Sequence, residues 1–323
     1  MLGARRLVPR GLAFAAALLS ARGFTQDAPP EAAPSAAQPK VEAPQPVDEI
    51  VVRGRRMSEI EFDLRLVVQK FIGNVAAPVE GRGYARWNRR VCIGVHNLTT
   101  TDAAQYIVDR ISQEAADVGL QPGEPGCRPD VVIIFATDAK QLATYLVKTR
   151  TRLFLPGMGR SGMNLSRDAL DAFAKSDKPV RWWDVSMPID PHTNGRAIRL
   201  SEDDSAPAIA VEGPSRIHSG TRDDLQQVIV IVDTTKLHGT TWQQLADYLA
   251  VVSLAQINPD ADLAAFDSIL NLFSNPNAYS GLTDWDRSYI RALYSYDPEQ
   301  TPVVQRNELV TQMTSREVER TVR

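Results

Sequence analysis

The strongest constraint on the fold is a run of five consecutive β-branched residues, Val228 to Val232. None of the five is polar, so the run predicts a strand that is buried on both faces. A strand of this kind needs packed elements above and below it. The chain therefore predicts an α/β (α+β) fold, a mixed β-sheet with packed helices.

Further apolar runs predict the other strands, and segments with helical periodicity separate them. The strands are expected at residues 91–96, 130–136, 180–187, 208–211 and 225–233. The helices are expected at residues 102–118, 138–148, 167–175, 242–257, 266–273 and 285–294. Together they predict one domain from about residue 57 to residue 300, followed by a charged C-terminal helix or tail at residues 301–323.

Two helices carry specific start signals. Ser58 and Glu61 have the spacing of a capping box, which predicts that the first helix begins at Ser58. Asp138 is expected to cap the helix that follows it. The apolar residues of the first helix recur at helical spacing: Ile60, Leu64, Val67, Val68, Phe71 and Ile72.

Residues 1–23 have the features of a secretory signal peptide. Three arginines precede an 11-residue apolar run, which ends in Ala21-Arg22-Gly23. The run is shorter than the roughly 20 residues that a spanning helix needs. We therefore expect export to the periplasm or cell envelope of a Gram-negative bacterium. The alternative is an uncleaved segment that anchors the chain in the membrane.

A Pro/Ala-rich linker is expected at residues 24–48, because 12 of the 20 residues from Asp27 to Pro46 are Pro or Ala. The next segment, Asp48 to Arg56, resembles the energy-coupling box near the N-terminus of TonB-dependent outer-membrane receptors. That resemblance implies an extended segment and a Gram-negative envelope. The alternative interpretation is a strand that docks on an exposed sheet edge.

The charge balance argues against nucleic acid as a partner. The chain has 36 Lys and Arg against 39 Asp and Glu, a net charge of −3. Loss of residues 1–23 removes four Arg and no acid, which leaves 32 basic residues and a net charge near −7. Binding to phosphates needs a clustered excess of basic residues.

One local cluster is basic. No acid occurs between Gly81 and Thr101, where Tyr84 and Trp87 interleave with Arg82, Arg86, Arg89 and Arg90. This cluster is a candidate patch for an anionic partner such as a lipid headgroup, a cell-wall polymer or an acidic peptide. The alternative is a solvated lead-in to a strand.

The two cysteines, Cys92 and Cys127, each lie beside an expected strand. Export favours a disulfide between them, and two buried free thiols are the alternative. Two cysteines are too few for a closed zinc site.

Two motifs match in part but lack the residues or the context that they need, and two others are absent. Residues 157–162 match G-x-G-x-x-G, but the next helix starts later and no nucleotide site is expected. Residues 258–269 imitate a calcium loop without its glycine and its closing Glu. The histidines, at positions 96, 192, 218 and 238, form no H-E-x-x-H pair, and no G-x-S-x-G occurs.

The expected helix at 242–257 and the segment after it resemble the zinc-binding half of zincin metallopeptidases, in a degenerate form. Residues 243–251 match the H-E-x-x-H helix at its apolar positions, and residues 282–294 resemble the closing helix of metzincins. The polar positions of the motif, with its glycine and the third His of metzincins, are occupied by Gln243, Gln244, Asp247, Ala250 and Ser253. The chain is also similar to secreted Gram-negative families related to these peptidases.

The resemblance implies a zincin-like domain without its chemistry, because a Gln amide is a poor zinc ligand and no Glu activates water. We therefore expect a non-catalytic binding module with no metal or cofactor, whose ligand is a peptide, a glycan or an envelope protein. The alternatives are a hydrolase with a different residue set and a structural tether. The candidate residues of the degenerate cleft are Gln243, Gln244, Asp247, His238 and His218.

Overall fold

The computed structural model describes residues 49–155, 166–197 and 215–322. The expected signal peptide, the Pro/Ala linker, the glycine motif at 157–162 and the expected strand at 208–211 lie outside these residues. Within the described ranges, none of the helices is long and apolar enough to cross a membrane.

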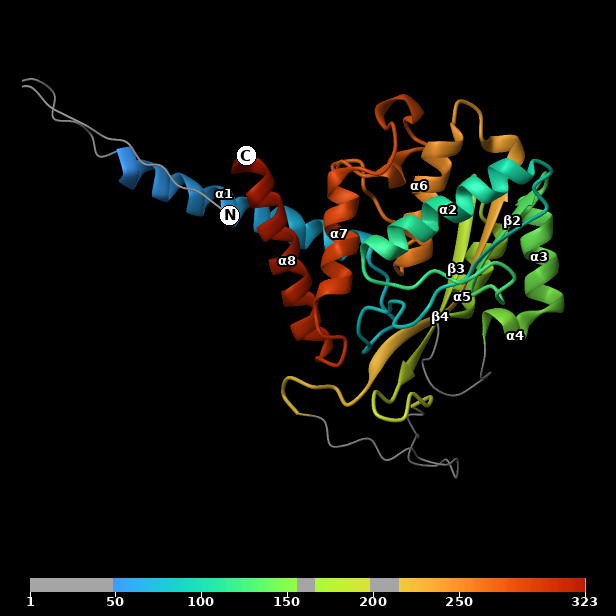
Figure 1. Ribbon diagram of the computed structural model, residues 1–323, viewed down its shortest axis with the longest axis horizontal. Coiled ribbons are helices and arrows are strands. Elements are labelled where there is room, and N and C mark those ends of the chain that lie inside the picture. The colour runs from blue at the N-terminus through green and yellow to red at the C-terminus, as the bar shows by residue number, and fades with distance from the viewer. Residues whose placement is uncertain (1–48, 156–165, 198–214, 323) are drawn as a thin grey trace, which may run out of the picture. The chain divides into compact units, whose positions relative to one another are not determined.

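Four strands form one mixed sheet in the order β1-β2-β4-β3 (Figure 1). The strands are β1 (Ile93–His96), β2 (Val131–Ala136), β3 (Val180–Ile189) and β4 (Arg222–Asp233). β1, β2 and β4 are parallel, and β3 pairs with β4 in the antiparallel direction. The predicted class, a mixed sheet with packed helices, is confirmed.

β4 is the interior strand that the run of β-branched residues predicts. Its residues 228–232 pair with β2 on one side and with β3 on the other. Val228, Val230 and Val232 belong to one apolar core, whereas Ile229 and Ile231 belong to the other. Alternation along an extended chain thus buries both faces of this strand.

Helices cover both faces of the sheet (Figure 1). One layer contains α1 (Glu49–Val75), α2 (Thr101–Asp117), α6 (Trp242–Leu254), α7 (Asp284–Ser295) and α8 (Pro302–Val322). The other contains α3 (Ala139–Thr149), α4 (Thr151–Phe154) and α5 (Arg167–Lys175). Short 3₁₀ turns lie at Thr234–Lys236, Ile269–Asn271 and Pro276–Ala278.

The N-terminal part of α1 corrects the sequence analysis. The helix begins at Glu49, so residues 50–56 are helical and neither an extended box nor an added strand. Ser58 lies inside the helix, and the predicted capping box there is wrong. Extending a helix costs far less than nucleating one, and the Arg residues and Met57 favour helix. Val68, Phe71 and Ile72 are buried as their spacing predicts, whereas Ile60 and Val67 are exposed.

Two other helices are shorter than predicted. α6 ends at Leu254, because the next residues are extended and Gln256 O accepts a bond from Ala77 N. The helix predicted at 266–273 is reduced to the single turn at Ile269–Asn271, where Asp286 accepts from Ile269 N. In both places a long-range hydrogen bond of the backbone, from Ala77 N in one case and to the Asp286 carboxylate in the other, replaces helical hydrogen bonds.

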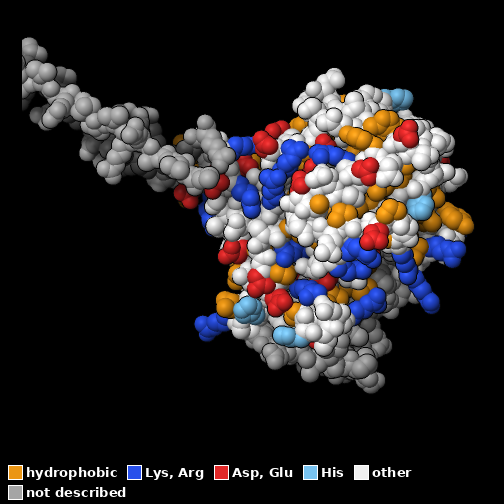
Figure 2. All heavy atoms as spheres, in the orientation of Figure 1, with side chains coloured by type: hydrophobic (Ala, Val, Ile, Leu, Met, Phe, Trp, Pro, Cys, Tyr) orange, Lys and Arg blue, Asp and Glu red, His pale blue; other side chains and the backbone are white. Residues whose placement is uncertain are grey.

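The C-terminal helix α8 packs on α1 and α7. Leu309, Val310 and Met313 are buried in the same core as α6. Ser288 Oγ of α7 donates to Glu317 at 2.6 Å. Over the face drawn in Figure 2, charges of both signs are interspersed with apolar side chains.

Cys92 and Cys127 form a disulfide, with their Cα atoms 6.1 Å apart. The bond links the segment before β1 to the segment before β2. Gly123 lies against it, and a Cβ there would overlap Cys127 Sγ and approach Cys92 Cβ to 3.0 Å. The predicted pairing is therefore present in the structure.

Replacing both cysteines by serine should lower the free energy of unfolding by about 3–4 kcal/mol in the chain-entropy model. The reason is that the bond closes a loop between residues 35 apart in sequence. Denaturant unfolding of the oxidised protein and of the double variant measures the difference. Two alkylatable thiols in freshly isolated wild-type protein would contradict the bond itself.

Candidate functional site

The first two turns of α6 hold Gln243, Gln244 and Asp247, the candidate residues of the degenerate cleft on this helix. Thr241 and Gln244 form a capping box, with Thr241 N donating to Gln244 Oε1 at 2.7 Å and Gln244 N donating back to Thr241 Oγ1 at 3.2 Å. Gln244 Nε2 also donates to Pro276 O, at 2.8 Å, and to Tyr279 O. Both ends of this amide are therefore used to start the helix and to hold the loop before α7.

Asp247 is 1% exposed and links three segments. Its Oδ1 accepts from Arg110 Nε of α2, and its Oδ2 accepts from Leu282 N at 2.8 Å. A Cβ on Gly281 would overlap Asp247 Oδ2 and would come within 3.3 Å of Gln243 Nε2. The carboxylate thus acts as a structural clamp between α2, α6 and the turn before α7.

Arg110 is a residue that the sequence analysis missed. It also pairs with Glu114 on its own helix, at 2.8 Å. Arg110 and Asp247 are 137 residues apart in sequence, so no local pattern predicts their contact. The only local signal was the i,i+4 pair, which is common on helix surfaces.

The histidines do not join this cluster as a set. His218 precedes β4 and His238 follows it, and a strand of 12 residues spans roughly 40 Å. Both side chains lie on exposed residues, as does His96 at the end of β1. Within the described ranges, no group of three or more His, Cys, Asp and Glu is placed to hold a metal ion.

The four arginines of the candidate anion patch point to different environments. Arg82 Nε binds Asp223 at 2.6 Å. Arg86 is buried, donates to Leu293 O at 2.6 Å and lies over the rings of Tyr294 and Tyr296. Burial lowers the pKa of Arg86. Arg89 and Arg90 remain exposed.

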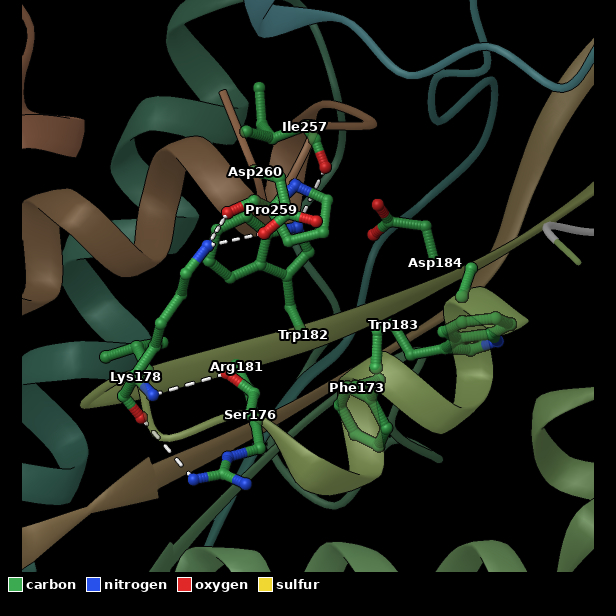
Figure 3. A pocket seen from close by; sticks show the side chains of 13 residues that line it. Phe173, Ser176, Lys178, Arg181, Trp182, Trp183, Asp184, Ile257, Pro259 and Asp260 are labelled. Carbon is green, nitrogen blue, oxygen red and sulfur yellow. Dashed lines mark hydrogen bonds and ion pairs between the residues drawn. The ribbon is translucent and has the colours of Figure 1, made fainter. Parts of the chain in front are cut away.

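A hollow runs beside the outer edge of β3, between α5 and the segment that follows α6 (Figure 3). Trp182 Nε1 donates to Ile257 O at 3.0 Å, and Lys178 Nζ binds Asp260 at 2.8 Å. An adjoining hollow of about 330 Å³ shares Lys178, Trp182 and Ile257, and is also lined by Tyr248 and Phe273. Tyr248 is the α6 residue in this lining, whereas Gln243 and Asp247 are absent from it.

Asp184 of β3 is a second residue that the sequence analysis missed. Its side chain lines the hollow, on the same side of β3 as Trp182 and opposite Trp183 (Figure 3). Its Oδ1 is buried and has no hydrogen-bond partner among the residues that the structure describes. Burial raises the pKa of Asp184 well above the ordinary value.

Asp247→Asn should lower the free energy of unfolding by about 2–4 kcal/mol, because it removes the buried carboxylate that joins Arg110 to Leu282 N and leaves Arg110 with Glu114 alone. Urea unfolding measures this loss. The matched control is Asp284→Asn, since Asp284 is 66% exposed and its ion pairs with Arg287 and Arg320 are 4.0 and 3.4 Å long. The control should cost less than about 1 kcal/mol. Equal losses in the two variants would contradict the clamp.

Asp184→Asn should remove a destabilisation that grows with pH. In the unfolded chain the carboxyl ionises near its ordinary pKa, while the folded state retains the proton until its raised pKa. Between those two pKa values the free energy of unfolding of the wild type falls by about 1.4 kcal/mol for each unit that the pH rises. The free energy of unfolding of the variant, relative to that of the wild type, should therefore increase from pH 5 to pH 8.

The control for this pH series is Asp260→Asn, because the Asp260 side chain is 78% exposed. It should keep the wild-type pH dependence. A constant difference between Asp184→Asn and wild type at every pH would show that Asp184 is ionised in the folded state.

Comparison with known proteins adds no relative. No family model matches the sequence, and no similar protein and no solved structure was found among those compared. The proposals that follow rest on the residues of this chain and on their geometry.

Proposed function

We propose that this protein is an exported, non-catalytic binding module of the Gram-negative cell envelope. Its ligand, a peptide, a glycan or a segment of an envelope protein, would occupy the hollow between β3 and the segment after α6. The observation that carries this proposal is the lining of that hollow by Trp182, Tyr248 and Phe273, next to polar groups of Lys178 and Asn271. Aromatic surfaces with a few polar groups are typical of binding sites.

The non-catalytic part of the proposal is supported by the use of the polar residues on α6. Gln244 and Asp247 both make hydrogen bonds that hold the structure, which leaves neither as an obvious base. A hydrolase built from Asp247, His238 and His218 is the alternative. It is disfavoured because the two histidines flank opposite ends of β4.

A degenerate zincin-like domain is the finer form of the proposal. It is supported by a mixed sheet whose antiparallel edge strand and interior strand come before α6, and by the later helix α7. The motif likeness of α6 and α7 adds to it. A structural tether, carried by the Pro/Ala linker, remains the third interpretation.

One sample can test both the envelope location and the proposed lack of a catalytic zinc ion. Protein isolated from the periplasmic fraction should begin near Phe24, because the charged start, the apolar run and the small residues occur in order. The same protein, purified without chelator or added metal, should hold far less than one zinc per chain by elemental analysis. Asp247 is the only ordinary ligand among the motif positions on α6, and one carboxylate does not retain zinc.

Two outcomes would contradict this proposal. Intact Met1 on a cytosolic pool would remove the envelope assignment. Near-stoichiometric zinc, lost together with peptidase activity in Asp247→Ala, would replace the binding module by a working enzyme.

A further inference from the structure

A separate hollow of about 360 Å³ lies on the α3–α5 side of the sheet. Four arginines line it, and each comes from a different segment of the chain. Arg89 precedes β1, Arg128 precedes β2, Arg152 belongs to α4 and Arg196 follows β3. The volume is within the range of sites for small molecules.

Among the described residues, the positive charges of this hollow are not balanced by carboxylates. Asp130 is the only acidic residue in the lining that these residues form, and it is already engaged by Arg89 at 3.1 Å and by Cys92 N at 3.0 Å. Arg128, Arg152 and Arg196 have no carboxylate partner within the ranges that the structure describes. Four Arg and one Asp leave a formal charge of +3, in a chain whose net charge is −3.

A β-bulge supplies further donors. Val185 of β3 pairs with Gln227 and Ser186 pairs with Leu225, so Gln226 has no partner on β3. Gln226 and Gln227 both line the hollow, above a floor that includes the buried side chains of Val185 and Met187. Adjacent residues of a regular strand point to opposite faces, and bulges are known to redirect a side chain in this way.

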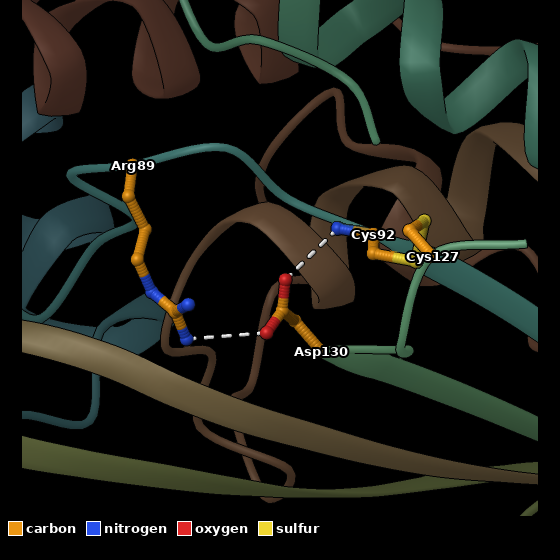
Figure 4. Close-up of a disulfide and its surroundings, with 4 residues drawn as sticks. All are labelled: Arg89, Cys92, Cys127 and Asp130. Atoms are coloured by element: carbon orange, nitrogen blue, oxygen red, sulfur yellow. Dashed lines mark hydrogen bonds and ion pairs between the residues drawn. A yellow bond between two sulfur atoms is a disulfide. The ribbon is translucent and has the colours of Figure 1, made fainter. Parts of the chain in front are cut away.

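The disulfide holds one wall of the hollow (Figure 4). Arg128 follows Cys127 directly, and Asp130 ties the same segment to Cys92 N and to Arg89. Pro129 packs against Gly94, where an added Cβ would lie 2.6 Å from Pro129 Cγ. These contacts fix the backbone that carries Arg128, so its position does not depend on a ligand.

We propose that this hollow binds a ligand that carries at least two phosphoryl groups. Guanidinium groups match phosphate oxygens with paired hydrogen bonds, and they stay charged at every physiological pH. A compact phosphoryl ligand can offset a charge of +3, whereas a single carboxylate offsets only one charge. The side-chain amides of Gln226 and Gln227 can donate to the remaining oxygens.

This site is independent of the proposed function, since it lies on the opposite layer of the sheet from the hollow at Trp182 and Tyr248. Arg89, Arg128, Arg152 and Arg196 are all exposed, so the guanidinium groups of this hollow are accessible from solvent. Free oligophosphates and the headgroups of phospholipids with two phosphoryl groups share the required chemistry, and the experiment separates them.

The test is calorimetric titration of the oxidised mature protein with inorganic tripolyphosphate. We expect one saturable site whose affinity falls as salt is added. Arg128→Gln and Arg152→Gln should each weaken binding on the order of tenfold, because each removes charged hydrogen bonds. Both residues are exposed, and neither forms an ion pair with another residue that the structure describes, so the variants should keep the wild-type melting temperature.

Arg90→Gln is the matched control, because Arg90 is exposed and next to Arg89 but does not line the hollow. It should bind tripolyphosphate as the wild type does. Cys92→Ser with Cys127→Ser should weaken binding, since the wall that carries Arg128 is released. Citrate should bind at least tenfold more weakly than tripolyphosphate.

Cosedimentation with phosphatidylcholine vesicles that contain cardiolipin, a phospholipid with two phosphodiester groups, identifies the source of the phosphoryl groups. Sedimentation that is lost in Arg128→Gln and Arg152→Gln, and absent with phosphatidylcholine alone, supports the site with a lipid headgroup as its ligand. Tripolyphosphate binding without sedimentation supports the site with a soluble ligand. Absence of saturable binding in both assays, equal affinity for citrate, or unchanged affinity in the Arg128 and Arg152 variants would overturn the proposal.

Discussion

The burial of β4 on both faces is the constraint on which the rest of the structure depends. Its valines enter one core and its isoleucines enter the other, so the strand needs helices on both sides. Its pairings with β2 and β3 set the register of the sheet. The hollow beside α5 and the arginine-lined hollow both lie along β3, the edge strand that pairs with β4. The bulge that leaves Gln226 without a partner on β3 is a local irregularity in that pairing.

The sequence predicts those elements whose signals are local. The helix at 167–175 and the cap at Asp138 agree with the structure, because the apolar spacing and the capping residue lie within one or two turns. The errors occur where distant contacts decide. α6 stops early because Gln256 bonds to Ala77, and the helix at 266–273 is replaced by a turn that Asp286 holds. Neither Ala77 nor Asp286 can be inferred as a partner from the residue pattern of the helix itself.

The candidate sites are less predictable than the fold for the same physical reason. The sequence placed Gln243, Gln244 and Asp247 together, which one turn of helix requires, but it did not place Arg110 beside them. It also grouped Arg82, Arg86, Arg89 and Arg90 because they are neighbours in the chain. In the fold, Arg82 and Arg86 bind Asp223 and Leu293 O within the protein. Arg89 instead lines a hollow with arginines up to 107 positions away in sequence.

The two kinds of arginine in this protein differ in what stabilises them. Arg82, Arg86 and Arg110 are paired with carboxylates, carbonyls or aromatic rings, so their burial is offset within the folded chain. Arg128, Arg152 and Arg196 have no such partners among the described residues, so their hydrogen-bond donors face solvent or a ligand. A phosphoryl ligand, as proposed above, would supply the negative charge that these residues lack. The disulfide already orders the wall that carries Arg128, so binding would cost little conformational entropy there.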